Sequence, residues 1–205
     1  RPEWGSALAG FFADRLRRPP TALDELARLE SQLGDLARSP AIQGVLAQAV
    51  ETGGESAAIA LRVMATSPLK EAPAVWLKAL TGSLTADSKI LRQQAVATAR
   101  AVTLPKNVPA PLLAALAQIG RSSSESASTR LEALSLVSRS LGTVDADLFT
   151  FLTRSVRPDQ PLRDRANAAD TLARASLSRD QLLGLAATVR SLGALELPRV
   201  LGAFE

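Results

Sequence analysis

Three pairs of carboxylates are the features of this sequence with the clearest capacity for acid–base chemistry. They are Asp24 with Glu25, Glu51 with Glu55, and Asp145 with Asp147. Two carboxylates that face each other in a pocket can divide the roles of general acid and general base. Each pair here falls at an expected helix start or on a solvent face, where a carboxylate stabilises the helix without any catalytic role. A carboxylate-based enzyme is therefore the least favoured of the functions that we consider.

The chain contains neither histidine nor cysteine. Histidine is the usual proton shuttle near neutral pH and the commonest metal ligand. Cysteine supplies thiolate nucleophiles, zinc–thiolate sites and the attachment points of c-type haem. We therefore predict no catalytic residue, no cofactor-binding residue and no metal ligand, and we expect a protein that is not an enzyme.

Arginine recurs in an Arg-x-x-Ala pattern at Arg92, Arg130 and Arg165. One interpretation is a basic ladder on a concave surface that receives an acidic partner. The other, which we favour, is an internal ladder in which each arginine bonds acids or carbonyls of an adjacent repeat. The acidic candidates for such bonds are Asp87, Asp159 and Asp170. Arg163 followed by Ala166 fits the third position equally well, so the register there is open by two residues.

The basic residues do not form the concentrated stripe that nucleic-acid binding usually requires. The formal net charge is +4, and the arginines are spread along the chain among acidic residues. The one small cluster is Arg15, Arg17 and Arg18. A solvated surface is the favoured interpretation of this charge pattern, and a nucleic-acid-binding helical repeat is the alternative function.

The two tryptophans are expected to have different roles. Trp76 belongs to a recurring apolar pair described below, where a large core residue is expected, so we predict that it is buried. Trp4 lies close to the N-terminal end of the sequence. We predict that Trp4 makes an inter-domain contact.

The elements that position these residues are predicted to be helices. Ala and Leu, which favour helices, dominate the 46% hydrophobic share, and aromatic residues make up only 3%. No sustained alternation of β-branched or aromatic residues indicates a strand. Pro and Gly divide the chain into predicted helices at 3–17, 22–38, 41–52, 55–65, 74–84, 88–102, 110–121, 127–141, 146–156, 162–175, 179–192 and 195–204. Ser178 with Gln181 fits a capping box, and Asp145 can cap its helix.

A paired apolar anchor recurs in alternate predicted helices. The pairs are Val45-Leu46, Trp76-Leu77, Leu112-Leu113, Leu148-Phe149 and Leu182-Leu183. Their first members lie 31, 36, 36 and 34 residues apart. A near-constant period with two helices in each repeat is typical of an α-solenoid, in which stacked hairpins share a continuous core. We expect the anchors to fill the space between layers and small residues such as Ala95 and Ala133 to allow close helix approach.

The pattern resembles HEAT repeats, in which a Pro-led helix with paired leucines precedes a helix that carries an arginine and small residues. The clearest unit is Pro109–Leu116 followed by Thr129–Leu134. The resemblance implies an all-α, right-handed α-solenoid of about six HEAT-like hairpins. We expect residues 1–205 to form one such domain, with 1–39 as an atypical N-terminal cap and 40–205 as the repeats.

A second resemblance covers roughly residues 145–205. The segments that carry it are Asp147–Leu152, Ala168–Leu177, Asp180–Leu183 and Leu195–Leu201. They look like the helical repeat region of large bacterial proteins in which a propeller of the membrane-bound dehydrogenase type precedes the repeats and a c-type haem domain follows. That resemblance implies an extracytoplasmic, periplasmic protein of redox character, with this segment as the spacer.

We therefore expect a non-catalytic scaffold or spacer and protein-interaction module, excised from a longer multidomain protein. Its expected partners are proteins, either flanking domains of the same chain or a separate protein. Since no stretch approaches the roughly 20 apolar residues that span a bilayer, no membrane insertion is expected.

Overall fold

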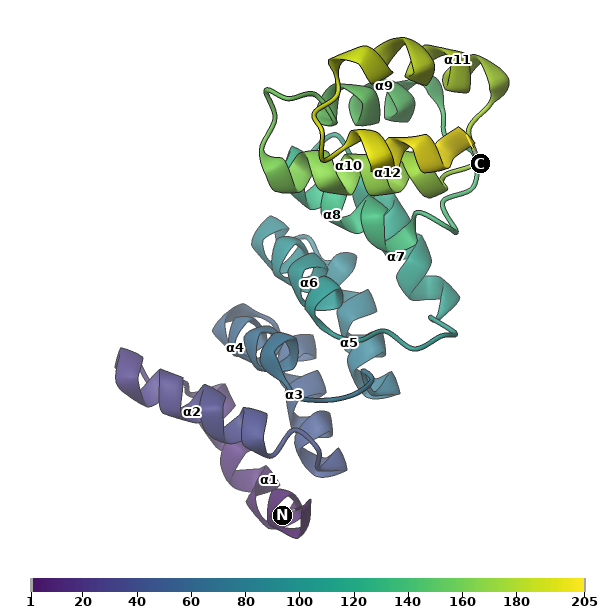
Figure 1. Ribbon diagram of the computed structural model, residues 1–205. Helices are drawn as coiled ribbons and strands as arrows, with labels where there is room; N and C mark the ends of the chain where they lie inside the picture. Colours follow the sequence, from purple (N-terminus) through teal and green to yellow (C-terminus); the bar gives the residue numbers. More distant parts are fainter. Residues whose placement is uncertain (1, 205) are drawn as a thin grey trace. The chain divides into compact units, whose positions relative to one another are not determined.

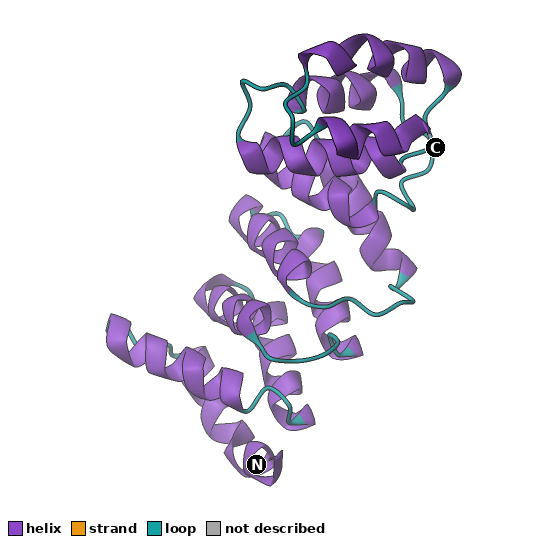
Figure 2. Cartoon of the chain, in the orientation of Figure 1, coloured by secondary structure: helices purple, strands orange, loops and turns teal. Residues whose placement is uncertain are grey.

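The computed structural model describes residues 2–204, and it confirms the all-α class for this part of the chain. The α-helices are α1 (Pro2–Arg17), α2 (Leu23–Asp35), α3 (Pro40–Thr52), α4 (Gly54–Thr66), α5 (Ala74–Leu84), α6 (Lys89–Ala101), α7 (Ala110–Arg121), α8 (Ala127–Val137), α9 (Ala146–Ser155), α10 (Leu162–Arg174), α11 (Arg179–Thr188) and α12 (Leu197–Leu201). Two short 3-10 helices are η1 (Val189–Ser191) and η2 (Gly202–Phe204). Figure 2 shows these helices joined by short loops, without a strand among the described residues.

The chain divides into two compact units, one ending at Ala115 and the other beginning at Leu116, within α7. The expectation of one repeat domain over residues 1–205 stays a prediction. No helix within residues 2–204 is long and apolar enough to cross a membrane.

In the first unit the helices pack in two parallel series (Figure 1). Helix α3 packs on both α1 and α5, while α4 packs on both α2 and α6. Each series therefore contains the corresponding helices of successive hairpins. The hairpin α1–α2 takes part in this layering in the same way as the two hairpins that follow it.

Buried apolar side chains and a few specific hydrogen bonds hold these layers together. Leu46 and Trp76, both predicted anchors, are fully buried. The Trp76 indole Nε1–H donates to the Gln43 carbonyl at 3.1 Å, which joins α5 to α3. The Thr98 hydroxyl donates to the Leu61 carbonyl at 3.1 Å, which joins α6 to α4. The prediction that Trp76 is a core residue is confirmed.

In the second unit α10 is the central helix, and it packs against α8, α9 and α12. Helix α11 lies on α9. The small residues Ala133 and Ala168 are fully buried, and the role of such alanines in close helix approach stays a prediction. The last anchor prediction is wrong, because Leu183 is 63% exposed and Leu185 is the buried leucine of α11.

Local chemistry explains where several helices begin and end. The Ser178 hydroxyl accepts from the Gln181 backbone N–H, and the Gln181 side chain accepts from the Ser178 N–H, so the predicted capping box is confirmed. The predicted cap at Asp145 is confirmed as well, because its carboxylate accepts from the Leu148 N–H at 2.8 Å.

Several predicted helices are longer than those observed, chiefly those at 22–38, 127–141, 179–192 and 195–204. The helix predicted at 127–141 ends at Val137, where the Ser138 and Ser140 hydroxyls donate to carbonyls one turn back and compete with the helical pattern. The segment predicted as one helix at 195–204 forms α12 followed by η2, with Pro198 in the first turn of α12.

Candidate functional site

Three arginines occupy the same position in three second helices of hairpins. Arg92, Arg130 and Arg165 are each the fourth residue of their helix, in α6, α8 and α10. We call them the fourth-residue arginines. Arg163, which matched the sequence pattern equally well, lies two residues earlier in α10 and pairs with Glu132 at 2.8 Å. By position in the helix, Arg165 rather than Arg163 corresponds to Arg92 and Arg130.

Arg92 turns back toward the end of the preceding helix. Its Nη1 donates to the Ala86 carbonyl at 2.6 Å and to the Asp87 carbonyl at 2.8 Å. Both carbonyls belong to the turn that joins α5 to α6. The final carbonyls of a helix have no partner within that helix and favour nearby cations. Arg92 therefore caps the turn of its own hairpin.

Arg130 makes a similar contact and a second one to an aromatic ring. Its Nε donates to the Gly120 carbonyl, in the last turn of α7, at 3.1 Å. Its guanidinium carbon lies 3.7 Å from the centre of the Phe151 ring in α9, which is a cation–π contact. Burial lowers the pKa of Arg130 from its ordinary value, because desolvation disfavours the charged form. Arg130 thus joins three successive helices.

Replacing Arg130 with Met should lower the free energy of unfolding by about 1–2 kcal/mol, because one hydrogen bond and the cation–π contact are lost. Urea unfolding followed by circular dichroism measures this change. Neither contact pairs two charged side chains, so the loss should persist in high salt.

The matched control for this substitution is Arg139→Met, because Arg139 is an exposed arginine just beyond the same helix. Arg139→Met should change stability by less than about 0.5 kcal/mol. Equal losses for the two variants would contradict the assigned role of Arg130.

Arg165 combines a turn carbonyl with a carboxylate. Its Nη1 donates to the Pro158 carbonyl, in the turn between α9 and α10, at 2.9 Å. Its Nε lies 3.2 Å from Oε1 of Glu196, whose exposed fraction is 2%. Glu196 precedes α12, so this ion pair holds the start of α12 against α10. Sequence reasoning missed Glu196, because an isolated glutamate in a Leu-rich segment gives no signal of burial.

Two of the three acids proposed as partners for the arginine ladder contact an arginine, but not in the predicted way. Arg92 bonds the backbone carbonyl of Asp87. The carboxylate of Asp170 lies 3.2 Å from Nη1 of Arg199. What the fourth-residue arginines share is a carbonyl at or after the end of the preceding helix. Whether they also face a concave binding surface stays a prediction.

Three of the six paired carboxylates, Asp24, Glu25 and Asp145, contact an arginine or cap a helix. Asp24 pairs with Arg28 one turn later, and Glu25 lies 3.7 Å from Arg15. The Asp145 carboxylate caps α9 and also lies 2.9 Å from Nη1 of Arg121. Among the described residues, no group of three or more acidic side chains is arranged to hold a metal ion.

The N-terminal helix carries the other predicted contact residue. Trp4 is 57% exposed, and Phe11, two turns further along α1, is 55% exposed. Residues seven apart share a face of a helix, so the two rings form an apolar patch on α1. The predicted inter-domain contact of Trp4 stays a prediction.

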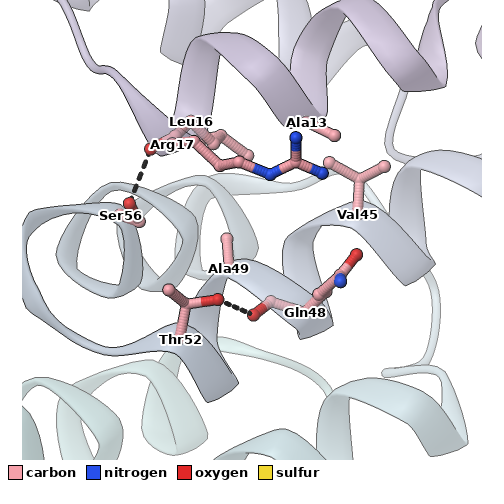
Figure 3. Close-up of a pocket in the computed structure, with 8 residues that line it drawn as sticks. All are labelled: Ala13, Leu16, Arg17, Val45, Gln48, Ala49, Thr52 and Ser56. Carbon is pink, nitrogen blue, oxygen red and sulfur yellow. Dashed lines mark hydrogen bonds between the residues drawn. The ribbon is translucent and has the colours of Figure 1, made fainter.

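A small cavity lies between α1, α3 and α4 in the first unit (Figure 3). Its volume is about 40 Å³, which is room for one or two water molecules. The Ser56 hydroxyl at its edge donates to the Leu16 carbonyl at 2.6 Å, and the Thr52 hydroxyl donates to the Gln48 carbonyl at 2.9 Å. Both hydroxyls therefore already donate to backbone carbonyls. The cavity is too small for an organic ligand, and we interpret it as a packing defect.

The arginine cluster of α1 is partly neutralised by acids. Arg17 pairs with Asp14 at 2.7 Å and Arg15 with Glu25. These pairs leave little positive charge at this end of α1.

Comparison with protein-family models, curated proteins and solved structures finds no match for this chain.

Proposed function

We propose that this chain is a HEAT-like helical repeat module that acts as a non-catalytic scaffold or spacer and protein-interaction surface within a larger extracytoplasmic protein. In the first unit, corresponding helices of successive hairpins pack on each other. We propose that the whole chain continues this arrangement as an α-solenoid of about six hairpins.

The observation that carries the proposal is the layering of the first unit. Each first helix packs on the first helix of the next hairpin, and each second helix packs on the next second helix. Neighbouring hairpins then bury the apolar faces that one hairpin cannot bury alone. Such stacking is typical of repeat proteins whose long surfaces bind other proteins.

The recurrence of the fourth-residue arginines supports a single repeating design in both units. Arg92 lies in the first unit, while Arg130 and Arg165 lie in the second. Each uses its guanidinium to satisfy carbonyls at a hairpin turn. The most regular polar feature of the chain therefore serves structure, which favours a scaffold over an enzyme.

Sequencing the coding region on both sides of this segment tests the spacer role. We expect a signal peptide and propeller-like strands upstream, and a Cys-x-x-Cys-His haem attachment motif downstream. Flanking sequence with neither a propeller nor a haem motif would overturn the spacer role within a redox protein.

A further inference from the structure

A groove in the second unit runs between α9 and α11, which pack on each other (Figure 1). Its volume is about 440 Å³, within the range of sites that bind small ligands or short segments. The residues that line it are Thr150, Thr153, Arg154, Arg157, Ala187 and Thr188. We call it the α9–α11 groove.

The two arginines of this groove have no carboxylate partner among residues 2–204, whereas some arginines of the same unit do. Arg121, Arg163 and Arg199 in the same unit each pair with an acidic side chain. Arg154 and Arg157 are exposed, and within residues 2–204 neither has such a pair.

The sequence of α9 explains why these charges are uncompensated. Side chains interact along a helix at spacings of three and four residues. The residues before Arg154 at these spacings are Phe151 and Thr150, and the residue three positions after it is Arg157. Arg157 lies just beyond the end of α9 at Ser155, and both arginines line the groove, so an anion bound there can pair with either guanidinium group.

The hydroxyl groups of Thr150 and Thr153 indicate which hydrogen-bonding groups a ligand of the groove should carry. The Thr150 hydroxyl donates its hydrogen to the Ala146 carbonyl at 2.8 Å, and the Thr153 hydroxyl donates to the Phe149 carbonyl at 2.9 Å. Each oxygen can then only accept a further hydrogen bond. A matching ligand must carry N–H or O–H donors as well as negative charge.

On these grounds we infer that the α9–α11 groove binds an acidic peptide segment of a partner protein. Carboxylates of the peptide pair with Arg154 and Arg157, and backbone N–H groups donate to the threonine oxygens. A DNA backbone offers phosphate acceptors without such donors, and no aromatic residue lines the groove for stacking of DNA or RNA bases. This inference rests on the proposed interaction function and names the class of partner.

The test measures the affinity of the 205-residue chain for a blocked hexapeptide of alternating glutamate and glycine that carries a neutral fluorophore. Fluorescence anisotropy should show binding that weakens as salt rises. The same peptide with glutamine in place of glutamate should bind at least about tenfold more weakly. The double substitution Arg154→Gln, Arg157→Gln should weaken glutamate-peptide binding about tenfold, because two charge-assisted contacts are lost.

The matched control is Arg139→Gln with Arg174→Gln, which removes the same charge from exposed positions outside the groove. It should leave the affinity within about twofold. Equal binding by the two double variants would overturn the groove as the site while leaving peptide binding intact. Preference for a single-stranded oligonucleotide, or no binding of the glutamate peptide at all, would overturn the groove as an acidic-peptide site, while the spacer role is tested separately by the flanking coding sequence.

Discussion

Replacing Trp76 with Ala should lower the free energy of unfolding by about 3–5 kcal/mol, the largest effect that we expect from one substitution. The indole is fully buried where α5 packs on α3, and its N–H is bonded to the Gln43 carbonyl. Truncation removes buried apolar area and leaves a cavity that the surrounding helices can close only partly.

Trp76→Phe separates the two contributions. Phenylalanine keeps most of the apolar contact but has no N–H, so the loss should fall to about 1–2 kcal/mol. Urea unfolding followed by circular dichroism at 222 nm gives both values.

The other tryptophan of the chain supplies the control. Trp4→Ala should change stability by less than about 0.5 kcal/mol, because Trp4 is exposed. Acrylamide quenching provides an independent check, since the emission of Trp76 should be protected in the Trp4→Phe variant. A loss below about 1 kcal/mol for Trp76→Ala would contradict the assignment of Trp76 to the core.

Trp76 was predictable because it combines a repeat position with a large apolar side chain. The repeat period identifies the apolar residues on one face of each helix, and this face is buried when a neighbouring hairpin packs against it. The same pattern failed at Leu183, which has the expected spacing but is exposed on α11. A repeat pattern in the sequence thus predicts on which face of its helix a residue lies. Burial of that residue also requires a second helix that covers this face.

The contacts of the fourth-residue arginines show a second limit. Their recurrence was visible in the sequence, but an arginine side chain has several acceptors within reach, and sequence does not rank them. Carbonyls at a helix end are always available as acceptors, whereas an acidic partner must be brought near by the fold. This explains why Arg92 bonds two turn carbonyls, whereas Arg165 pairs with Glu196 because the fold brings the start of α12 against α10.

Close helix approach was predicted from alanines, but α7 also comes close to α8 at a glycine, Gly120. A Cβ added at Gly120 would lie 2.5 Å from Cγ and 2.6 Å from Cδ2 of Leu134, which is fully buried. Gly120→Ala should therefore lower the free energy of unfolding by about 1–3 kcal/mol, since Leu134 must leave its position or α7 must shift from α8. Urea unfolding followed by circular dichroism measures the change.

Gly184→Ala is the matched control in the same unit and should have the opposite sign. Gly184 lies inside α11, and its added Cβ would make only an ordinary contact of 3.5 Å with the Phe149 ring. Alanine there should stabilise the chain by about 0.5–1 kcal/mol through its higher helix propensity. Placing Gly120→Ala in a Leu134→Ala background should remove most of its cost, because the clashing atoms are gone. If Gly120→Ala stabilised the chain as Gly184→Ala does, close packing of α7 on α8 at this glycine would be refuted.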